Sequence, residues 1–175
     1  MTWDAYNRRK TALRDMLALA DRHEDVKLAH LIETVPGARE AFDDPRIALF
    51  DAQMAFVQRV RGRVDMMLGD GLQNESVRHE EAVVQAWAEV AQSMRGARKL
   101  LDAAEAEGDL AKAFAKERAM LATMAGVPAL HPDLDDHGAR LRAAARERVA
   151  EHQALDALSE PRGGIIGRLR DALAA

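Results

Sequence analysis

Apolar residues recur at three- and four-residue steps along most of the chain, which is the pattern of amphipathic α-helices. Near the N-terminus this pattern predicts a helix over residues 3–22, with an apolar face made of Trp3, Tyr6, Leu13, Met16, Leu17 and Ala20. A shorter helix after Asp25 is expected to end at Pro36-Gly37, because proline lacks a backbone donor and glycine permits a turn. One further turn of helix is predicted over residues 38–42.

The clearest predicted helix runs from Pro45 to Leu68. Asp44 can accept hydrogen bonds from the first-turn amides, and Pro45 already has a helical φ. The apolar stripe of this helix consists of Ile47, Phe50, Met54, Val57, Val60, Val64 and Met67. We expect it at the centre of the fold.

The second half of the chain predicts further helices from Asn74 or Ser76 to Gly96, over 97–107, over 109–125, and from Asp133 to about Leu158. The last of these has a narrow apolar face, formed by Leu134, Leu141, Ala145, Val149, His152 and Leu155. Such a face predicts that the helix packs at the periphery or pairs with another chain.

These patterns predict an all-α fold: a single-domain helical bundle of about six or seven helices over residues 1–160, followed by a hinge and a short amphipathic helix over 161–175. No segment alternates as a strand would. The chain begins without an apolar leader and contains no long apolar stretch, so we expect a cytoplasmic protein with no membrane span.

The sequence lacks the patterns that mark common catalytic and cofactor sites. It has no cysteine, no Glu-x-x-His pair, no His-Glu-x-x-His motif, no nucleophile elbow and no glycine-rich phosphate loop. Its arginine clusters lie among acidic residues and would release few counterions, which argues against nucleic-acid binding. We therefore predict no catalytic residue and no cofactor.

One cluster could bind a divalent metal. Imidazole and carboxylate groups gather within seven residues at a proline-bounded turn, at His131, Asp133, Asp135, Asp136 and His137. The favoured interpretation is that Asp133 or Asp135 caps the following helix and that the acidic side chains stabilise its positive N-terminal end.

The C-terminal segment is the main candidate for partner binding. After Pro161-Arg162-Gly163-Gly164, one stripe of a short helix would be formed by Ile165, Ile166, Leu169 and Leu173. Such a segment could dock on a protein partner or a second copy, or fold back on its own bundle. Residues 164–169 loosely resemble the C-terminal peptides that load cargo into encapsulin shells, although they lack the usual serine before leucine.

The aromatic and methionine side chains can be interpreted in two ways. They could line a ligand pocket or an adaptable groove, but their spacing favours core packing. The aromatic residues concerned are Trp3, Tyr6, Trp87 and the four phenylalanines, and the methionines are Met54, Met66, Met67, Met94, Met120 and Met124. The leading functional hypothesis is a non-enzymatic helical interaction protein or a homo-oligomer. The alternatives are a metal-binding or metal-dependent enzyme with His and carboxylate ligands from separate helices, and a weak nucleic-acid-binding protein.

Overall fold

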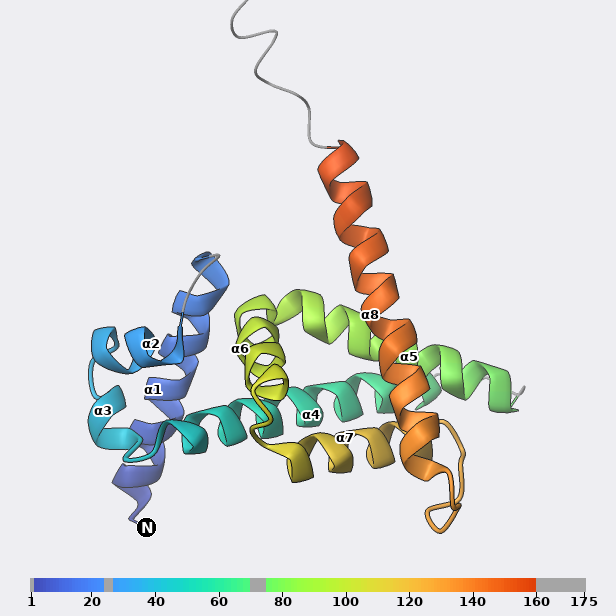
Figure 1. The fold of residues 1–175 in the computed structure, drawn as a ribbon, viewed down its shortest axis with the longest axis horizontal. Coiled ribbons are helices and arrows are strands. Elements are labelled where there is room, and N and C mark those ends of the chain that lie inside the picture. The colour runs from blue at the N-terminus through green and yellow to red at the C-terminus, as the bar shows by residue number, and fades with distance from the viewer. Residues whose placement is uncertain (1, 24–26, 70–74, 160–175) are drawn as a thin grey trace, which may run out of the picture.

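Figure 1 shows the fold in a computed structural model of the chain, which describes residues 2–23, 27–69 and 75–159. All regular structure in these residues is helical, which confirms the predicted all-α fold. The helices are α1 (Trp3–Arg22), α2 (Leu28–Thr34), α3 (Ala38–Ala41), α4 (Pro45–Gly69), α5 (Glu75–Ser93), α6 (Arg95–Ala106), α7 (Ala111–Met124) and α8 (Leu134–Ser159). Within the described ranges, none of these helices combines the length and the apolar character needed to cross a bilayer.

Several helix ends lie where local sequence signals place them. The Thr2 side chain accepts a hydrogen bond from the amide of Ala5 at the start of α1. Gly37 adopts a positive φ of 76° between α2 and α3, a conformation that glycine reaches without strain. Asp44 accepts a hydrogen bond from the amide of Arg46 at 2.9 Å, so the predicted start of α4 is confirmed.

The buried face of α4 differs from the predicted stripe in its first half. Ile47, Phe50 and Met54 are 36%, 45% and 40% exposed, whereas the interior of this half receives Ala48, Leu49, Ala52, Gln53 and Phe56. From Val60 onward the predicted and observed faces agree, since Val60 and Val64 are fully buried. The predicted stripe consists of apolar residues only and therefore leaves out Gln53, which is polar and 0% exposed.

Two glycines permit close helix contacts. A Cβ atom built at Gly96, near the start of α6, would lie 2.5 Å from the backbone of Ala20 in α1. A Cβ atom at Gly138 in α8 would lie 1.9 Å from the carbonyl oxygen of Arg118 in α7. At both positions the absence of a side chain lets two helices approach backbone to backbone.

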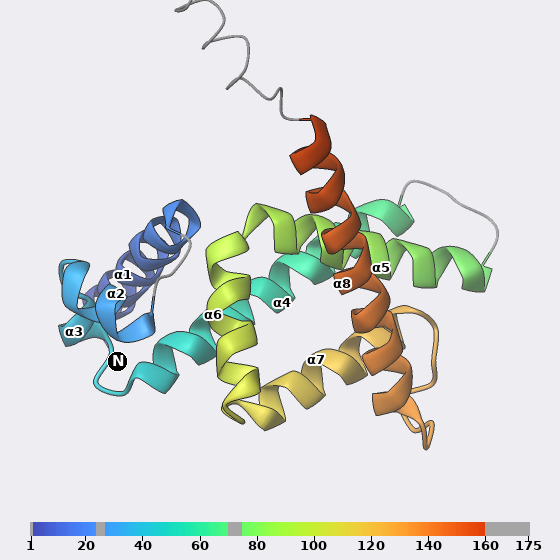
Figure 2. The same cartoon turned by 45° about the horizontal axis from the view of Figure 1, so that its top comes forward.

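The core consists of two apolar clusters. One is formed by side chains of α4 to α8 around Phe56, Trp87 and Leu121, and the other by α1 to α4 and α6 around Met16 and Leu31. Helices α4 and α6 contribute to both clusters, and α4 contacts α1, α2, α5, α6 and α7. In Figures 1 and 2, α8 crosses α5 and α7 with its first part and projects beyond the other helices with its C-terminal end.

Candidate functional site

The five predicted metal candidates lie just before α8 or in its first turns, and Asp135 and His137 contact two different arginines. Asp135 pairs with Arg118 at 2.8 Å, and His137 is 2.7 Å from a guanidinium nitrogen of Arg140. The backbone amide of Asp133 donates a hydrogen bond to His131 Nδ1 at 3.2 Å. The centres of the His131 and His137 rings lie 5.3 Å apart.

Within the described part of the chain, no three His, Cys, Asp or Glu side chains are placed to share a metal ion. Asp135 and Asp136 occupy the first turn of α8, where carboxylates favour the positive end of the helix. The predicted docking residues Ile165, Ile166, Leu169 and Leu173 lie outside the described residues.

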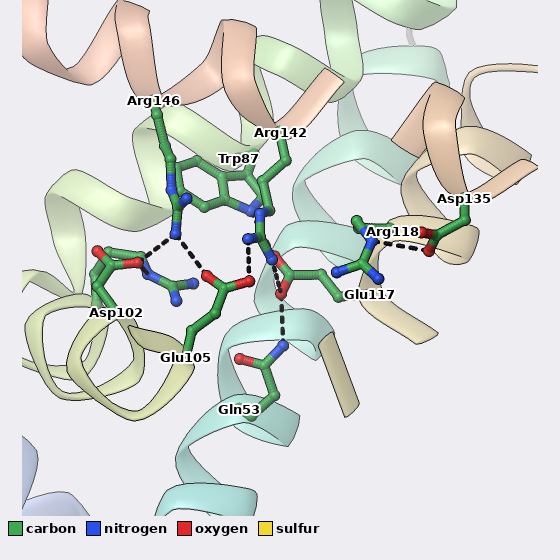
Figure 3. A network of polar contacts seen from close by, with 10 residues as sticks. Gln53, Trp87, Asp102, Glu105, Glu117, Arg118, Asp135, Arg142 and Arg146 are labelled. Carbon is green, nitrogen blue, oxygen red and sulfur yellow. Dashed lines mark hydrogen bonds and ion pairs between the residues drawn. The ribbon is translucent and has the colours of Figure 1, made fainter. Parts of the chain in front are cut away.

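A carboxylate is buried where α4, α5, α7 and α8 meet (Figure 3). Glu117 on α7 is 1% exposed. One of its oxygens accepts a hydrogen bond from Trp87 Nε1 at 2.7 Å, and the other accepts one from Gln53 Nε2 at 2.6 Å. The Arg142 guanidinium lies 3.8 Å from the second oxygen. Three other helices are therefore tied to one acidic side chain of α7.

A second layer of ion pairs connects α6 to α8. Arg142 donates to Glu105, and Arg146 donates to Glu105 at 2.9 Å and to Asp102 at 2.5 Å. Figure 3 shows Arg142 and Arg146 pointing from α8 toward the carboxylates of α6 and α7. Arg98 on α6 adds a further cation, because its Nε donates to Asp102 at 3.0 Å.

Of the described arginines in this cluster, Arg98 has the largest number of buried guanidinium nitrogens without a hydrogen-bond partner. Its side chain is 8% exposed, and its guanidinium lies 5.0 Å from the ring centre of Phe56 and 5.4 Å from that of Trp87. Among the described residues, its terminal nitrogens Nη1 and Nη2 have no hydrogen-bond partner. Burial lowers the pKa of Arg98, while the charges of Asp102 and Glu117 oppose that effect. The aromatic rings thus partly replace the hydrogen bonds that water would supply.

The charges and hydrogen bonds of the cluster stabilise the packing of its helices. Burial by itself would raise the pKa of Glu105, but hydrogen bonds from Arg142 and Arg146 and their charges outweigh that effect and lower the pKa from its ordinary value. Arg142 and Arg146 therefore favour the ionised form of Glu105. The ion pairs and hydrogen bonds of the cluster hold α6, α7 and α8 together.

A long groove runs along the other side of α4, between α1 and the α4–α6 pair. It consists of two adjoining hollows of about 580 and 440 Å³, which share Lys10, Leu13 and Ala55. We call it the α1–α4 groove. Its walls are mainly Tyr6, Leu13, Leu17 and Ala18 of α1, Met54 and Ala55 of α4, Met94 between α5 and α6, and Ala97 of α6.

Cationic side chains border this groove. Lys10, Arg14 and Arg59 line the larger hollow, against a single acidic residue, Asp21. Arg14 pairs with its exposed neighbour Asp15, whereas Lys10 and Arg59 are exposed and make no ion pair with any described residue. The groove therefore presents an apolar floor with a net positive rim.

Exposed aromatic residues lie at the N-terminal end of the groove. Trp3 is 74% exposed and stacks on Tyr6, which is 47% exposed and lines the smaller hollow with Met54. The prediction that aromatic and methionine residues pack in the core is confirmed for Trp87, Phe42, Phe56, Phe114 and Met94. It is wrong for Trp3, Tyr6, Phe50, Met54 and Met66, which are exposed. Large apolar side chains gathered at a surface are typical of binding sites.

Neither the buried cluster nor the groove was recognised from the sequence. Gln53, Trp87, Glu117 and Arg142 come from four helices, so no spacing along the chain relates them. The sequence of α1 contains a weak signal of the groove, because its aromatic residues extend the apolar stripe almost to the N-terminus.

Comparisons with protein-family models, with curated proteins and with solved structures find no match to this chain.

Proposed function

We propose that this chain is a non-enzymatic helical interaction protein whose α1–α4 groove binds an amphipathic helix with acidic side chains. The observation that carries the proposal is the combination of an apolar floor with the rim residues Lys10 and Arg59, which form no ion pair with any described residue. An amphipathic helix places apolar anchors at three- and four-residue steps and leaves its flanks for charged residues, which matches such a surface.

The dimensions of the groove support a helical occupant. It follows α1 from Tyr6 to Asp21, which corresponds to about 22 Å of helix. The core holds the helices that form the walls of the groove, because Leu13 and Leu17 of α1 pack against both apolar clusters. In addition, Arg9 of α1 donates two hydrogen bonds to Asp51 of α4, at 2.5 and 2.7 Å. A preformed groove requires little reorganisation on binding.

The cytoplasmic location expected from the sequence is part of this proposal.

Selection from a displayed library of amphipathic helices tests the proposal. Helices enriched on the protein should combine leucine-type anchors with acidic flanks. Their binding should be lost with the double variant Lys10→Glu/Arg59→Glu, because this change reverses the charge of the rim.

The chain offers a matched control for this variant. Arg8→Glu/Arg61→Glu makes the same change in net charge on the same two helices, two positions away from each groove residue, and neither Arg8 nor Arg61 lines the groove. This control should retain binding. Enriched helices that bind both double variants equally, or a failure to enrich acidic helices, would contradict the proposal.

A further inference from the structure

The C-terminal end of α8 has the properties that the proposed groove requires of its occupant. Val149 is the last residue of α8 that packs against the core, and all residues from Ala150 to Leu158 are exposed. Leu155 and Leu158 are 62% and 79% exposed and stand one helical turn apart. The predicted apolar face of this helix therefore continues past the point where its own bundle covers it.

The charges of this end are opposite to those of the groove. Residues 149–159 contain Glu151 and Asp156 and no lysine or arginine. The larger hollow of the groove contains Lys10, Arg14 and Arg59 against Asp21 alone. Glu151 lies one turn before Leu155 on the same helix face and Asp156 lies to one side of it, so an acidic helix end with two leucines would meet a groove with an apolar floor and a cationic rim.

We infer that the occupant of the α1–α4 groove is the α8 end of a second copy of this chain, an inference that rests on the function proposed above. Residues 150–159 form about 14 Å of helix, which fits within the groove. In Figures 1 and 2 the α8 end projects away from the bundle and lies apart from α1, so a straight α8 does not reach the groove of its own chain.

A reciprocal exchange between two copies gives a two-fold dimer. Each copy then supplies one α8 end and one groove, and the two equal contacts satisfy both exposed surfaces. Doubling the contact also brings the buried area closer to the roughly 1,200–2,000 Å² that stable interfaces require. In this dimer the exposed leucines of α8 contact the groove, and Lys10 and Arg59, which pair with no described acidic residue, meet acidic partners.

The solution mass of the full chain, measured by light scattering and sedimentation over a range of protein concentrations, tests the inference. The unaltered chain should form a dimer. Leu155→Glu/Leu158→Glu should shift the mass to that of one chain, whereas Leu130→Glu, at a position 98% exposed outside the proposed contact, should leave the dimer intact. These leucines are exposed in the single chain, so the variants should fold, as circular dichroism would verify.

A charge exchange tests whether the groove and the α8 end meet each other. Lys10→Glu/Arg59→Glu and Glu151→Lys/Asp156→Lys should each abolish the dimer, and the four changes combined in one chain should restore it. A monomeric unaltered chain, a dimer that survives all of these variants, or a combined variant that stays monomeric would overturn the inference.

The two proposals fail in different ways. If selected acidic helices bind the groove while the full chain stays monomeric at every concentration, the groove function holds and its occupant is a different protein. If the library yields no groove-dependent helix and the chain is monomeric, both proposals fall.

Discussion

The buried cluster beneath α8 and the α1–α4 groove both combine cationic side chains with apolar surface, but they differ in how each charge is satisfied. Beneath α8, Arg142 lies among the carboxylates of Glu105 and Glu117, and all three are largely shielded from water. Along the groove, Lys10 and Arg59 are exposed and lack an acidic partner among the described residues.

Because of this difference, we expect the cluster to stabilise the fold and the groove to bind a partner. Burying a charge is costly unless an opposite charge and hydrogen bonds accompany it, so removing one partner from the cluster beneath α8 should destabilise the fold. An exposed cation beside an apolar floor costs little and is available to a partner. Substitutions in the cluster should therefore change stability, and substitutions in the groove should change association.

The largest effect is expected from Glu117→Gln. This change keeps the size of the side chain but removes a buried charge that faces Arg142 and Arg98, and these two arginines then have only Glu105 and Asp102 as carboxylate partners. We expect a loss of about 3–5 kcal/mol in the free energy of unfolding, measured by urea denaturation. Glu147→Gln, at an exposed position of α8, is the matched control and should change stability by less than about 0.5 kcal/mol. Equal effects of the two substitutions would show that the buried charge is not needed.

A smaller loss is expected from Gly138→Ala. The added methyl group would meet the carbonyl of Arg118, so α7 and α8 must move apart, at a cost of about 1–3 kcal/mol. Gly62→Ala is the control, because a Cβ atom there meets nothing within 4 Å and α4 is helical at that point. It should stabilise the protein by about 0.5–1 kcal/mol. Thermal unfolding of both variants measures the difference, and a neutral Gly138→Ala would contradict the close contact.

The acid sensitivity of the cluster gives a third prediction. Because the folded-state pKa of Glu105 lies below 4.5, its ionised form favours folding at pH values above the unfolded pKa. This contribution is lost as the pH falls through the lower, folded-state value. Glu105→Gln should therefore make the stability less dependent on pH below about 4.5 than it is in the unaltered chain. Parallel stability curves for the two proteins would show that the Arg142 and Arg146 contacts do not shift this group.

The smallest effect on folding is expected from removing residues 161–175. The α8 end lies before this segment, so a chain that ends at Glu160 should retain its helical signal, its stability and its dimer. A fall in solution mass after this truncation would instead favour the predicted docking stripe of Ile165, Ile166, Leu169 and Leu173, and would move the association site from the α1–α4 groove to the C-terminal segment.

The sequence alone determined the elements of this protein. Asp44 and Pro45 start α4, and Gly37 turns the chain between α2 and α3, because capping and backbone freedom depend on neighbouring residues only. The period of the apolar residues likewise identified the long helices, since that period follows from helix geometry.

Only the tertiary structure decided which polar residues are inside and which apolar residues are outside. Gln53 and Glu117 are buried because they bond to each other across α4 and α7, 64 positions apart, and hydropathy assigns both to the solvent. Trp3 and Leu155 belong to the predicted apolar faces, yet they are 74% and 62% exposed. Periodicity describes one helix, whereas burial depends on what the other helices bring against it.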